Sequence, residues 1–239
     1  MKIKVIMSDK AMTRPVMDDR ERMLQAALSS DAEVSVDCIK KGPDELDCNT
    51  DEAFAAAEMV KESIRAEKEG YDAIVIYCFS DVGIDALREN VRIPVIGPGE
   101  VSLAAAHMLC NRFTVLTSES ANIPRTYRRL MRNGMARDKM VSVRALDIPI
   151  GELRVNPRAT EEYLRAVCKK AVEEDHADGI ILGCLGMAGY GKQLEQELPV
   201  KIIDPAFVAM AYAELCVRVG LSHIPAVYPV FTNASHVEL

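Results

Sequence analysis

The chain has 239 residues, of which 49% are hydrophobic and 27% are charged, and its formal net charge is -7. This composition is typical of a globular protein and excludes a disordered one, and the negative charge argues against nucleic acid or an anionic membrane surface as a partner. No apolar run is long enough to cross a membrane, the N-terminus lacks a signal-peptide core, and the seven cysteines have no paired spacing, so we expect a cytoplasmic protein with free thiols.

In its first half the chain alternates short apolar runs with longer helix-like segments. Hydrophobic spacing predicts strands at 4–7, 34–36, 73–77 and around Val95, and helices at 14–30, 47–70, 82–89 and 100–109. Strands and helices that alternate at this length are typical of a parallel sheet with right-handed crossovers.

The second half repeats this order. Strands are predicted at 113–119, 141–146, 180–182 and 201–203, and helices at 123–133, at 160–174, after Cys184 and at 207–219. Gly134 is the expected stop of the helix that precedes it, and Thr160 the expected N-terminal cap of its own helix. The tail from Gly220 contains two prolines and is expected to be irregular.

Two stretches of the chain are copies of one pattern. DAIVIYC at 72–78 and DGIILGC at 178–184 have the same spacing from aspartate to cysteine, and each is followed at a similar distance by a proline, Pro94 or Pro199. An apolar run of this kind predicts a strand buried on both faces of a parallel sheet. The repeat therefore predicts two lobes of similar fold, each with one cysteine at the carboxyl end of a buried strand.

These strand ends are the expected binding region. Open α/β sheets bind ligands at the carboxyl ends of their strands. In a flavodoxin-like order the first and third strands are neighbours, which places Ser8 beside Cys78 and Ser118 beside Cys184. If the lobes face each other across a pseudo-twofold axis, both thiols point into one shared cleft.

Two thiols on opposite sides of a carbon can invert a stereocentre without a cofactor, since one removes a proton while the other supplies one. Each of these thiols precedes an expected helix start, where unpaired N–H groups stabilise a thiolate, and N–H groups there would stabilise a developing oxyanion. The residues expected to hold the substrate are Ser8, Phe79, Ser80, Thr117, Ser118, Leu185 and Gly186. The other cysteines are expected to be packing residues: Cys38, Cys48, Cys110, Cys168 and Cys216.

Three motifs carry a resemblance to a known family. IYCFSDVG at 76–83, GPGE at 97–100 and LGCLGMAG at 182–189 resemble the two cysteine motifs and the intervening Gly-x-x-Glu of the hydantoin racemase family, within the aspartate/glutamate racemase superfamily. The similarity runs from the first strand to the last helix. It implies two pseudo-symmetric flavodoxin-like lobes with the active site between them, no cofactor, an oligomer, and Cys78 and Cys184 as the acid/base pair.

The resemblance also implies how the chain divides. The last helix is expected to pack on the first lobe, so lobe I comprises residues 1–97 and about 208–239, and lobe II comprises 98–207. Four further residues are expected to support the site without touching the substrate: Asp9, Pro98, Glu100 and Asp204.

One loop departs from the family pattern. Ser8-Asp9-Lys10-Ala11 stands where hydantoin and allantoin racemases usually have Asn-Pro-Asn-Thr. Lys10 and Arg14 either meet a substrate carboxylate or are simply solvated.

The sequence thus predicts a racemase acting on a hydantoin, an amino acid or a related carboxylate. Two alternatives stay open: an isomerase or decarboxylase of the same superfamily that uses one cysteine, and a non-catalytic protein that binds small anions. The four histidines lack metal-ligand spacing and the glycines after Cys184 do not form the dinucleotide fingerprint, so we expect neither a metal nor a cofactor.

Overall fold

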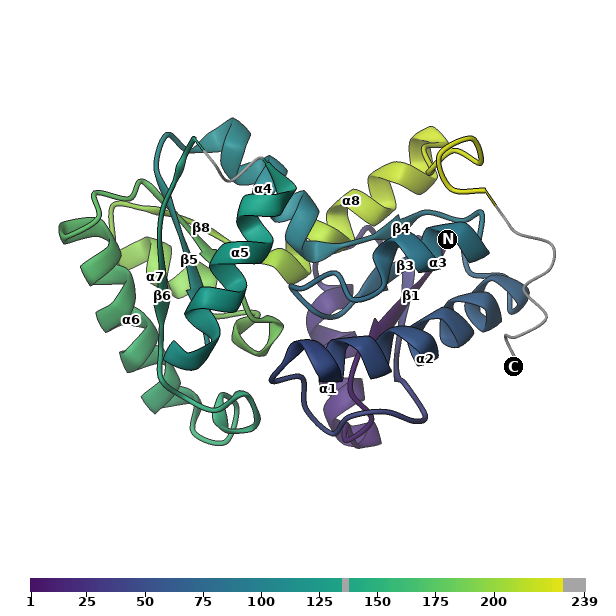
Figure 1. Cartoon of the computed structure of the whole chain (residues 1–239), viewed down its shortest axis with the longest axis horizontal. Coiled ribbons are helices and arrows are strands. Elements are labelled where there is room, and N and C mark those ends of the chain that lie inside the picture. The colour runs from purple at the N-terminus through teal and green to yellow at the C-terminus, as the bar shows by residue number, and fades with distance from the viewer. Residues whose placement is uncertain (135–137, 230–239) are drawn as a thin grey trace. The chain divides into compact units, whose positions relative to one another are not determined.

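The computed structural model describes residues 1–134 and 138–229. The chain divides into two compact units: unit 1 holds Met1–Pro98 and the chain from Ala209 onward, and unit 2 holds Gly99–Val208. Each unit contains one four-stranded sheet, coloured purple to blue in unit 1 and teal to green in unit 2 (Figure 1). The predicted α/β fold with two lobes is confirmed.

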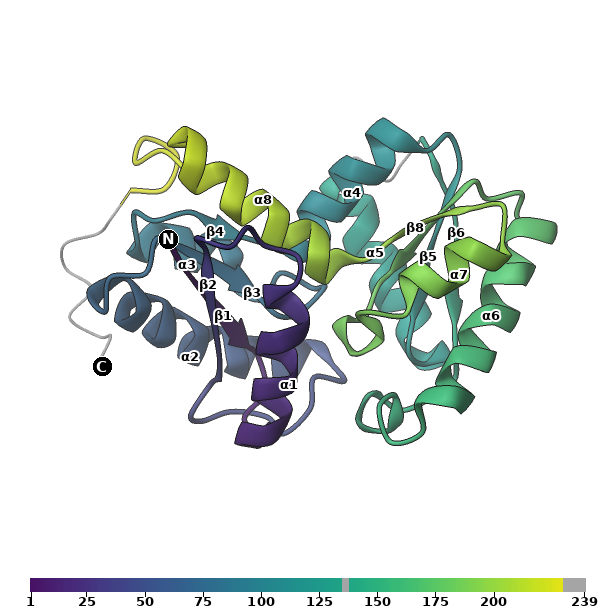
Figure 2. The same cartoon turned by 180° about the vertical axis from the view of Figure 1, so that it is seen from behind.

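Unit 1 is a parallel sheet in the order β2-β1-β3-β4. Its strands are β1 (Lys2–Met7), β2 (Glu33–Cys38), β3 (Ala73–Ile76) and β4 (Val95–Ile96), and its first three helices are α1 (Arg14–Gln25), α2 (Asn49–Lys68) and α3 (Ile84–Asn90). Helix α2 lies in front of the sheet in Figure 1 and α1 lies in front of it in the reverse view of Figure 2, so the two helices cover opposite faces. Every residue of β3 is buried, as a strand covered on both faces requires.

Helix α8 (Pro205–Val219) joins unit 1 from Ala209 onward. The backbone N–H of Ser29 donates to the carboxylate of Glu214 at 3.2 Å, and the Arg218 guanidinium pairs with Asp31 and with Glu214, at 2.6 Å each. These contacts attach the last helix to the loop that follows α1.

Unit 2 repeats the architecture in the order β6-β5-β7-β8, again all parallel. Its strands are β5 (Phe113–Thr117), β6 (Met140–Ala145), β7 (Gly179–Leu182) and β8 (Lys201–Ile203). Its helices are α4 (Pro98–Leu109), α5 (Ile123–Asn133), α6 (Pro157–Glu173) and α7 (Gly191–Glu197), with short 3-10 turns η1 (Ser120–Asn122), η2 (Ile150–Glu152) and η3 (Leu185–Met187). Helices α6 and α7 pack on one face of the sheet and α5 on the other (Figures 1 and 2).

Several helix ends differ from those expected. Thr160 is not the cap of α6: the side chain of Asn156 accepts from the N–H of Ala159 at 3.3 Å, and the helix begins at Pro157. Helix α1 ends at Gln25 because the following residues close into turns, in which the N–H groups of Ala27 and Leu28 bond to carbonyls three residues earlier. Gly134 ends α5 with a φ of 85°, as predicted.

The tail has no helix or strand over residues 220–229, and its remaining part, 230–239, lies outside the described residues. None of the helices in the described ranges combines the length and the apolar character that a membrane crossing needs.

Candidate active site

In unit 1 the first candidate thiol follows the carboxyl end of β3. Parallel pairing aligns Ile6 with Ile76, so the chain continues from these strands to Ser8 and Cys78 at the same edge of the sheet. Ser8 is buried, with 2% of its surface exposed, and Cys78 is partly buried. Ser8 and Cys78 therefore follow the ends of two neighbouring strands, as the sequence predicts.

A tight turn after Cys78 shapes the surroundings of the sulfur. Cys78 Sγ lies 3.2 Å from Ser80 Oγ, and the N–H of Asp81 donates to the carbonyl of Cys78 at 3.0 Å. Asp81 has a φ of 53°, an unusual conformation for a residue other than glycine, and a Cβ on Gly97 would lie only 2.6 Å from Asp81 Cγ. Gly97 is therefore required for the close packing that holds this turn, which also contains Phe79.

In unit 2 the second thiol occupies the corresponding position. Leu116 of β5 pairs with Leu182 of β7, and two residues later come Ser118 and Cys184. Thr117 and Ser118 are buried, with 5% and 2% of their surfaces exposed. Each unit thus brings together one cysteine and buried hydroxyl side chains at the end of its central strands.

The loop after Cys184 is a single turn of 3-10 helix. The N–H of Met187 donates to the carbonyl of Cys184 at 2.9 Å, which places Leu185 and Gly186 in the turn. A Cβ on Gly186 would approach Leu153 Cδ1 to 2.7 Å and Cys184 Sγ to 3.5 Å. Glycine at this position therefore allows the turn to lie close both to the sulfur and to η2.

Arg154 holds the same loop and was missed by the sequence analysis. Its Nε donates to the carbonyl of Gly186 at 2.9 Å, a second nitrogen donates to the carbonyl of Ala188, and its guanidinium lies 5.0 Å from the centre of the Tyr190 ring. Arg154 lies between the segments that resemble the family and outside any periodic element, so no signal in the sequence marks it.

Asp204 joins the Cys184 loop to the start of α8. Its two carboxylate oxygens accept from the N–H of Gly189 at 2.7 Å and from the N–H of Ala206 at 3.1 Å. Burial raises the pKa of this carboxyl, although the backbone hydrogen bonds and the charge of Arg154 oppose the shift. The carboxylate thus holds the backbone of the Cys184 loop against the first residues of α8.

Asp9 begins the loop after β1 and is partly desolvated. Burial raises its pKa from the ordinary 3.8 to about 6, and the negative charges of Glu45 and Asp44 add to the shift. Its Oδ1 is buried and has no hydrogen-bond partner among the described residues.

The two cations of this loop region are engaged by carboxylates. Lys10 Nζ lies 3.6 Å from Asp44, and Arg14 pairs with Asp18 and Glu21 at 2.5 and 2.6 Å. Both side chains are more than 40% exposed, so of the two interpretations the structure favours solvated surface charges.

Pro98 and Glu100 lie in the first turn of α4. Pro98 is the first residue of the helix, where a proline is well tolerated, and Glu100 places a negative charge at the positive end of the helix dipole. Pro98 belongs to unit 1 and Glu100 to unit 2.

Four other thiols of the chain are harder to ionise than an ordinary cysteine. Burial raises the pKa of Cys110, Cys168 and Cys216, that of Cys168 to about 12. At Cys38 burial raises the pKa and the negative charge of Asp9 adds to it. Within residues 1–134 and 138–229 no group of three or more His, Cys, Asp or Glu side chains is arranged to hold a metal ion.

Known proteins are similar to this chain in sequence and in fold over most of its length. The family described as Asp/Glu/Hydantoin racemase matches residues 11–213. A hydantoin racemase of Pseudomonas sp. (strain NS671) is 35% identical over 222 residues, which cover 92% of this chain and 87% of that protein. A hydantoin racemase of Paenarthrobacter aurescens is 32% identical over 214 residues, 89% of each chain. Allantoin racemase from Klebsiella pneumoniae has the same fold, with a TM-score of 0.90 and 27% identity over 98% of this chain and 94% of that one.

Proposed function

Since the chain belongs to the Asp/Glu/Hydantoin racemase family, we propose that it inverts an acidic C–H centre of a hydantoin-type or amino-acid-type substrate, with Cys78 and Cys184 as acid and base. The family resemblance expected from the motifs is confirmed, and the protein is an isomerase of the racemase class. The substrate and the pair of thiols are the proposal.

The observation that carries the two-cysteine mechanism is the equivalence of the two thiols. Each follows the third strand of its own sheet, and the two sheets have the same strand order. Each is also partly buried and followed directly by a tight turn. An enzyme that treats two mirror-image substrates alike needs two groups of the same chemical kind, one for each face of the carbon.

In the proposed reaction, the thiolate of one cysteine removes the proton of the stereocentre. The electron pair moves into the neighbouring carbonyl, and backbone N–H groups near Phe79, Leu185 and Gly186 stabilise the enolate oxygen. The thiol of the other cysteine then donates its proton to the opposite face of the carbon. After the reaction the cysteine that acted as the base is a thiol, and the cysteine that acted as the acid is a thiolate. The enzyme is then ready to invert the opposite enantiomer, and no cofactor is needed.

Hydroxyl groups near each cysteine are proposed to position the substrate. In this proposal the hydroxyls of Ser8 and Ser80, which belong to the same unit as Cys78, and those of Thr117 and Ser118, which belong to the same unit as Cys184, bind the polar edge of the substrate. A hydantoin-type ring is the favoured substrate because the 35% and 32% identical relatives are hydantoin racemases.

The deciding experiment follows inversion in heavy water. Each enantiomer of a 5-substituted hydantoin, of allantoin and of a free amino acid is incubated with the protein, and loss of optical rotation is measured together with deuterium at the stereocentre. We expect inversion with deuterium incorporation for a ring substrate. We expect the variants Cys78→Ser and Cys184→Ser to lose at least about a hundredfold in kcat, since proton transfer contributes roughly that much or more.

Cys38→Ser is the matched control, because Cys38 also lies at the end of a strand and is partly buried but lies outside the repeated motif. It should keep full activity. Inversion that survives loss of either thiol would contradict the mechanism, and release of carbon dioxide or a cis-trans change in place of inversion would favour the one-cysteine alternative.

A further inference from the structure

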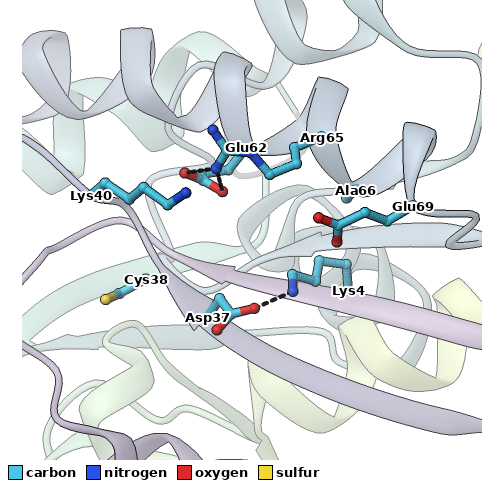
Figure 3. Close-up of a pocket in the computed structure, with 8 residues that line it drawn as sticks. All are labelled: Lys4, Asp37, Cys38, Lys40, Glu62, Arg65, Ala66 and Glu69. Atoms are coloured by element: carbon cyan, nitrogen blue, oxygen red, sulfur yellow. Dashed lines mark hydrogen bonds and ion pairs between the residues drawn. The ribbon is translucent and has the colours of Figure 1, made fainter. Parts of the chain in front are cut away.

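A hollow in unit 1 lies apart from the residues proposed for catalysis. It has a volume of about 280 Å³ and opens between strands β1 and β2 and the second half of α2 (Figure 3). Its lining consists of Lys4, Asp37, Cys38, Lys40, Glu62, Arg65, Ala66 and Glu69. The residues from α2 are spaced three and four apart, so a single face of that helix forms one wall. A volume near the lower end of the ~300–1,000 Å³ typical of ligand pockets suits a molecule of few atoms.

The lining carries three positive and three negative side chains, and four of these charges satisfy one another. Lys4 bonds to Asp37, and Arg65 bonds to Glu62 at 2.5 Å. Lys4 is 6% exposed, and its ammonium also lies 4.9 Å from the centre of the Tyr71 ring. Burial lowers the pKa of Lys4, but the hydrogen bonds and charges of Asp37 and Tyr71 together outweigh burial and raise it overall, so this ammonium stays charged.

Two charges of opposite sign remain. Across residues 1–134 and 138–229, the side chains of Lys40 and Glu69 make no hydrogen bond or ion pair within 4 Å, and both are exposed at the rim. In Figure 3 the Lys40 ammonium points into the hollow from one side and the Glu69 carboxylate from the opposite side. The hollow thus has no net charge but presents one free cation facing one free anion.

We propose that this hollow binds a small zwitterion such as a free α-amino acid, whose carboxylate pairs with Lys40 and whose ammonium pairs with Glu69. A simple anion would meet the Glu69 carboxylate, and a simple cation would meet the Lys40 ammonium, so either is disfavoured by like-charge repulsion. A zwitterion satisfies both, and its two charges match the two charged lining groups that make no hydrogen bond or ion pair within the described part of the chain. The bound molecule touches none of the residues proposed for catalysis, because none of them lines the hollow.

Calorimetric titration of the full chain tests this proposal. The probes are glycine and L-alanine, with acetate and methylammonium as analogues that carry one charge each. We expect the zwitterions to bind and each analogue to bind at least about tenfold more weakly, the ratio that corresponds to loss of one charge pair. Equal binding of acetate, or no heat from either amino acid up to the highest soluble concentration, would overturn the proposal.

Variants locate the binding. Lys40→Gln and Glu69→Gln should each weaken L-alanine binding about tenfold or more, and the double exchange Lys40→Glu with Glu69→Lys should recover binding because the zwitterion can enter reversed. Lys41→Gln is the control, since Lys41 is an exposed neighbour that does not line the hollow. All three sites are exposed, so thermal melts should match the parent protein. Binding that is unchanged in Lys40→Gln and Glu69→Gln would place the amino acid elsewhere, whether or not the racemase mechanism holds.

Discussion

At the scale of single residues, Ser80 Oγ lies 3.2 Å from the sulfur of Cys78, one of the two proposed catalytic groups. A hydroxyl at this distance can donate to a thiolate and stabilise its negative charge. In the proposed reaction Ser80 would therefore stabilise the Cys78 thiolate in addition to contacting the substrate.

We expect Ser80→Ala to lower kcat about tenfold, since one hydrogen bond to a charged group contributes roughly 1.5–3 kcal/mol at most in such sites. The measurement is kcat for inversion in both directions. Ser63→Ala is the control, because Ser63 is also buried and its hydroxyl donates to the carbonyl of Val60 at 2.7 Å within α2, away from either cysteine motif. Activity of Ser80→Ala equal to that of the control would show that the contact has no catalytic effect.

Asp9 gives a prediction about stability and pH. Its folded pKa of about 6 lies above the ordinary 3.8, so between these values the folded state binds more protons than the unfolded state. The free energy of unfolding therefore falls as pH rises from 4 to 6, and the folded state contains a poorly solvated charge at higher pH.

Asp9→Asn removes this charge. We expect the variant to be more stable than the parent by on the order of 2 kcal/mol at pH 8, and the difference to vanish below about pH 3, where Asp9 is protonated in both states. Urea unfolding at a series of pH values measures the effect. Glu162→Gln, on an exposed part of α6, should show no such difference; a parallel pH profile for Asp9→Asn and the parent would refute the assignment.

At the scale of elements, two turns decide where the sulfurs lie. The turn after β3 depends on Gly97, and the turn after β7 depends on Gly186 and Arg154. Neither turn is stabilised by its own short sequence alone; each is fixed by a segment from elsewhere in its unit.

Arg154→Met tests the second turn. The carbonyls of Gly186 and Ala188 lose their donor, so we expect kcat to fall about tenfold or more while KM changes less, and the free energy of unfolding to fall by roughly 1–3 kcal/mol. Arg154→Lys keeps the charge but not the two-pronged geometry, and should recover only part of kcat. Steady-state kinetics and urea unfolding separate these effects; a change in KM alone would mean that Arg154 binds substrate and does not position the loop.

At the scale of the whole molecule, the two units have the same strand order and one candidate thiol each. The proposed reaction needs two thiols at one carbon, and we propose that both come from the same chain. This proposal predicts how mixtures of the two single-cysteine variants behave.

Mixtures of Cys78→Ser and Cys184→Ser, denatured together and refolded, should stay as inactive as either variant alone. If the two thiols of one site came from different copies, about a quarter of the activity would return in a random dimer, by the symmetry of such assemblies. Parent protein carried through the same refolding is the control. Recovery of activity in the mixture would contradict the one-chain site while leaving the two-cysteine chemistry intact.

The α/β architecture with two similar lobes could be predicted from residue patterns alone. Fully buried parallel strands read as continuous apolar runs, so β3 and β7 were visible without any tertiary information, and their duplication indicated two similar lobes. The family motifs around Cys78 and Cys184 identified the class of enzyme because they lie in those same runs.

The contacts that hold the turns around these cysteines become evident only in the folded chain. Arg154, Gly97 and Asp204 act across tens of residues through hydrogen bonds and close packing, and such contacts leave no periodic pattern in a sequence. The cap of α6 likewise depended on which of two polar side chains, Asn156 or Thr160, reached a free N–H. The raised pKa of Asp9 and the arrangement of charges in the hollow beside α2 both depend on which side chains are buried. Burial is set by the packing of segments that lie far apart in the sequence.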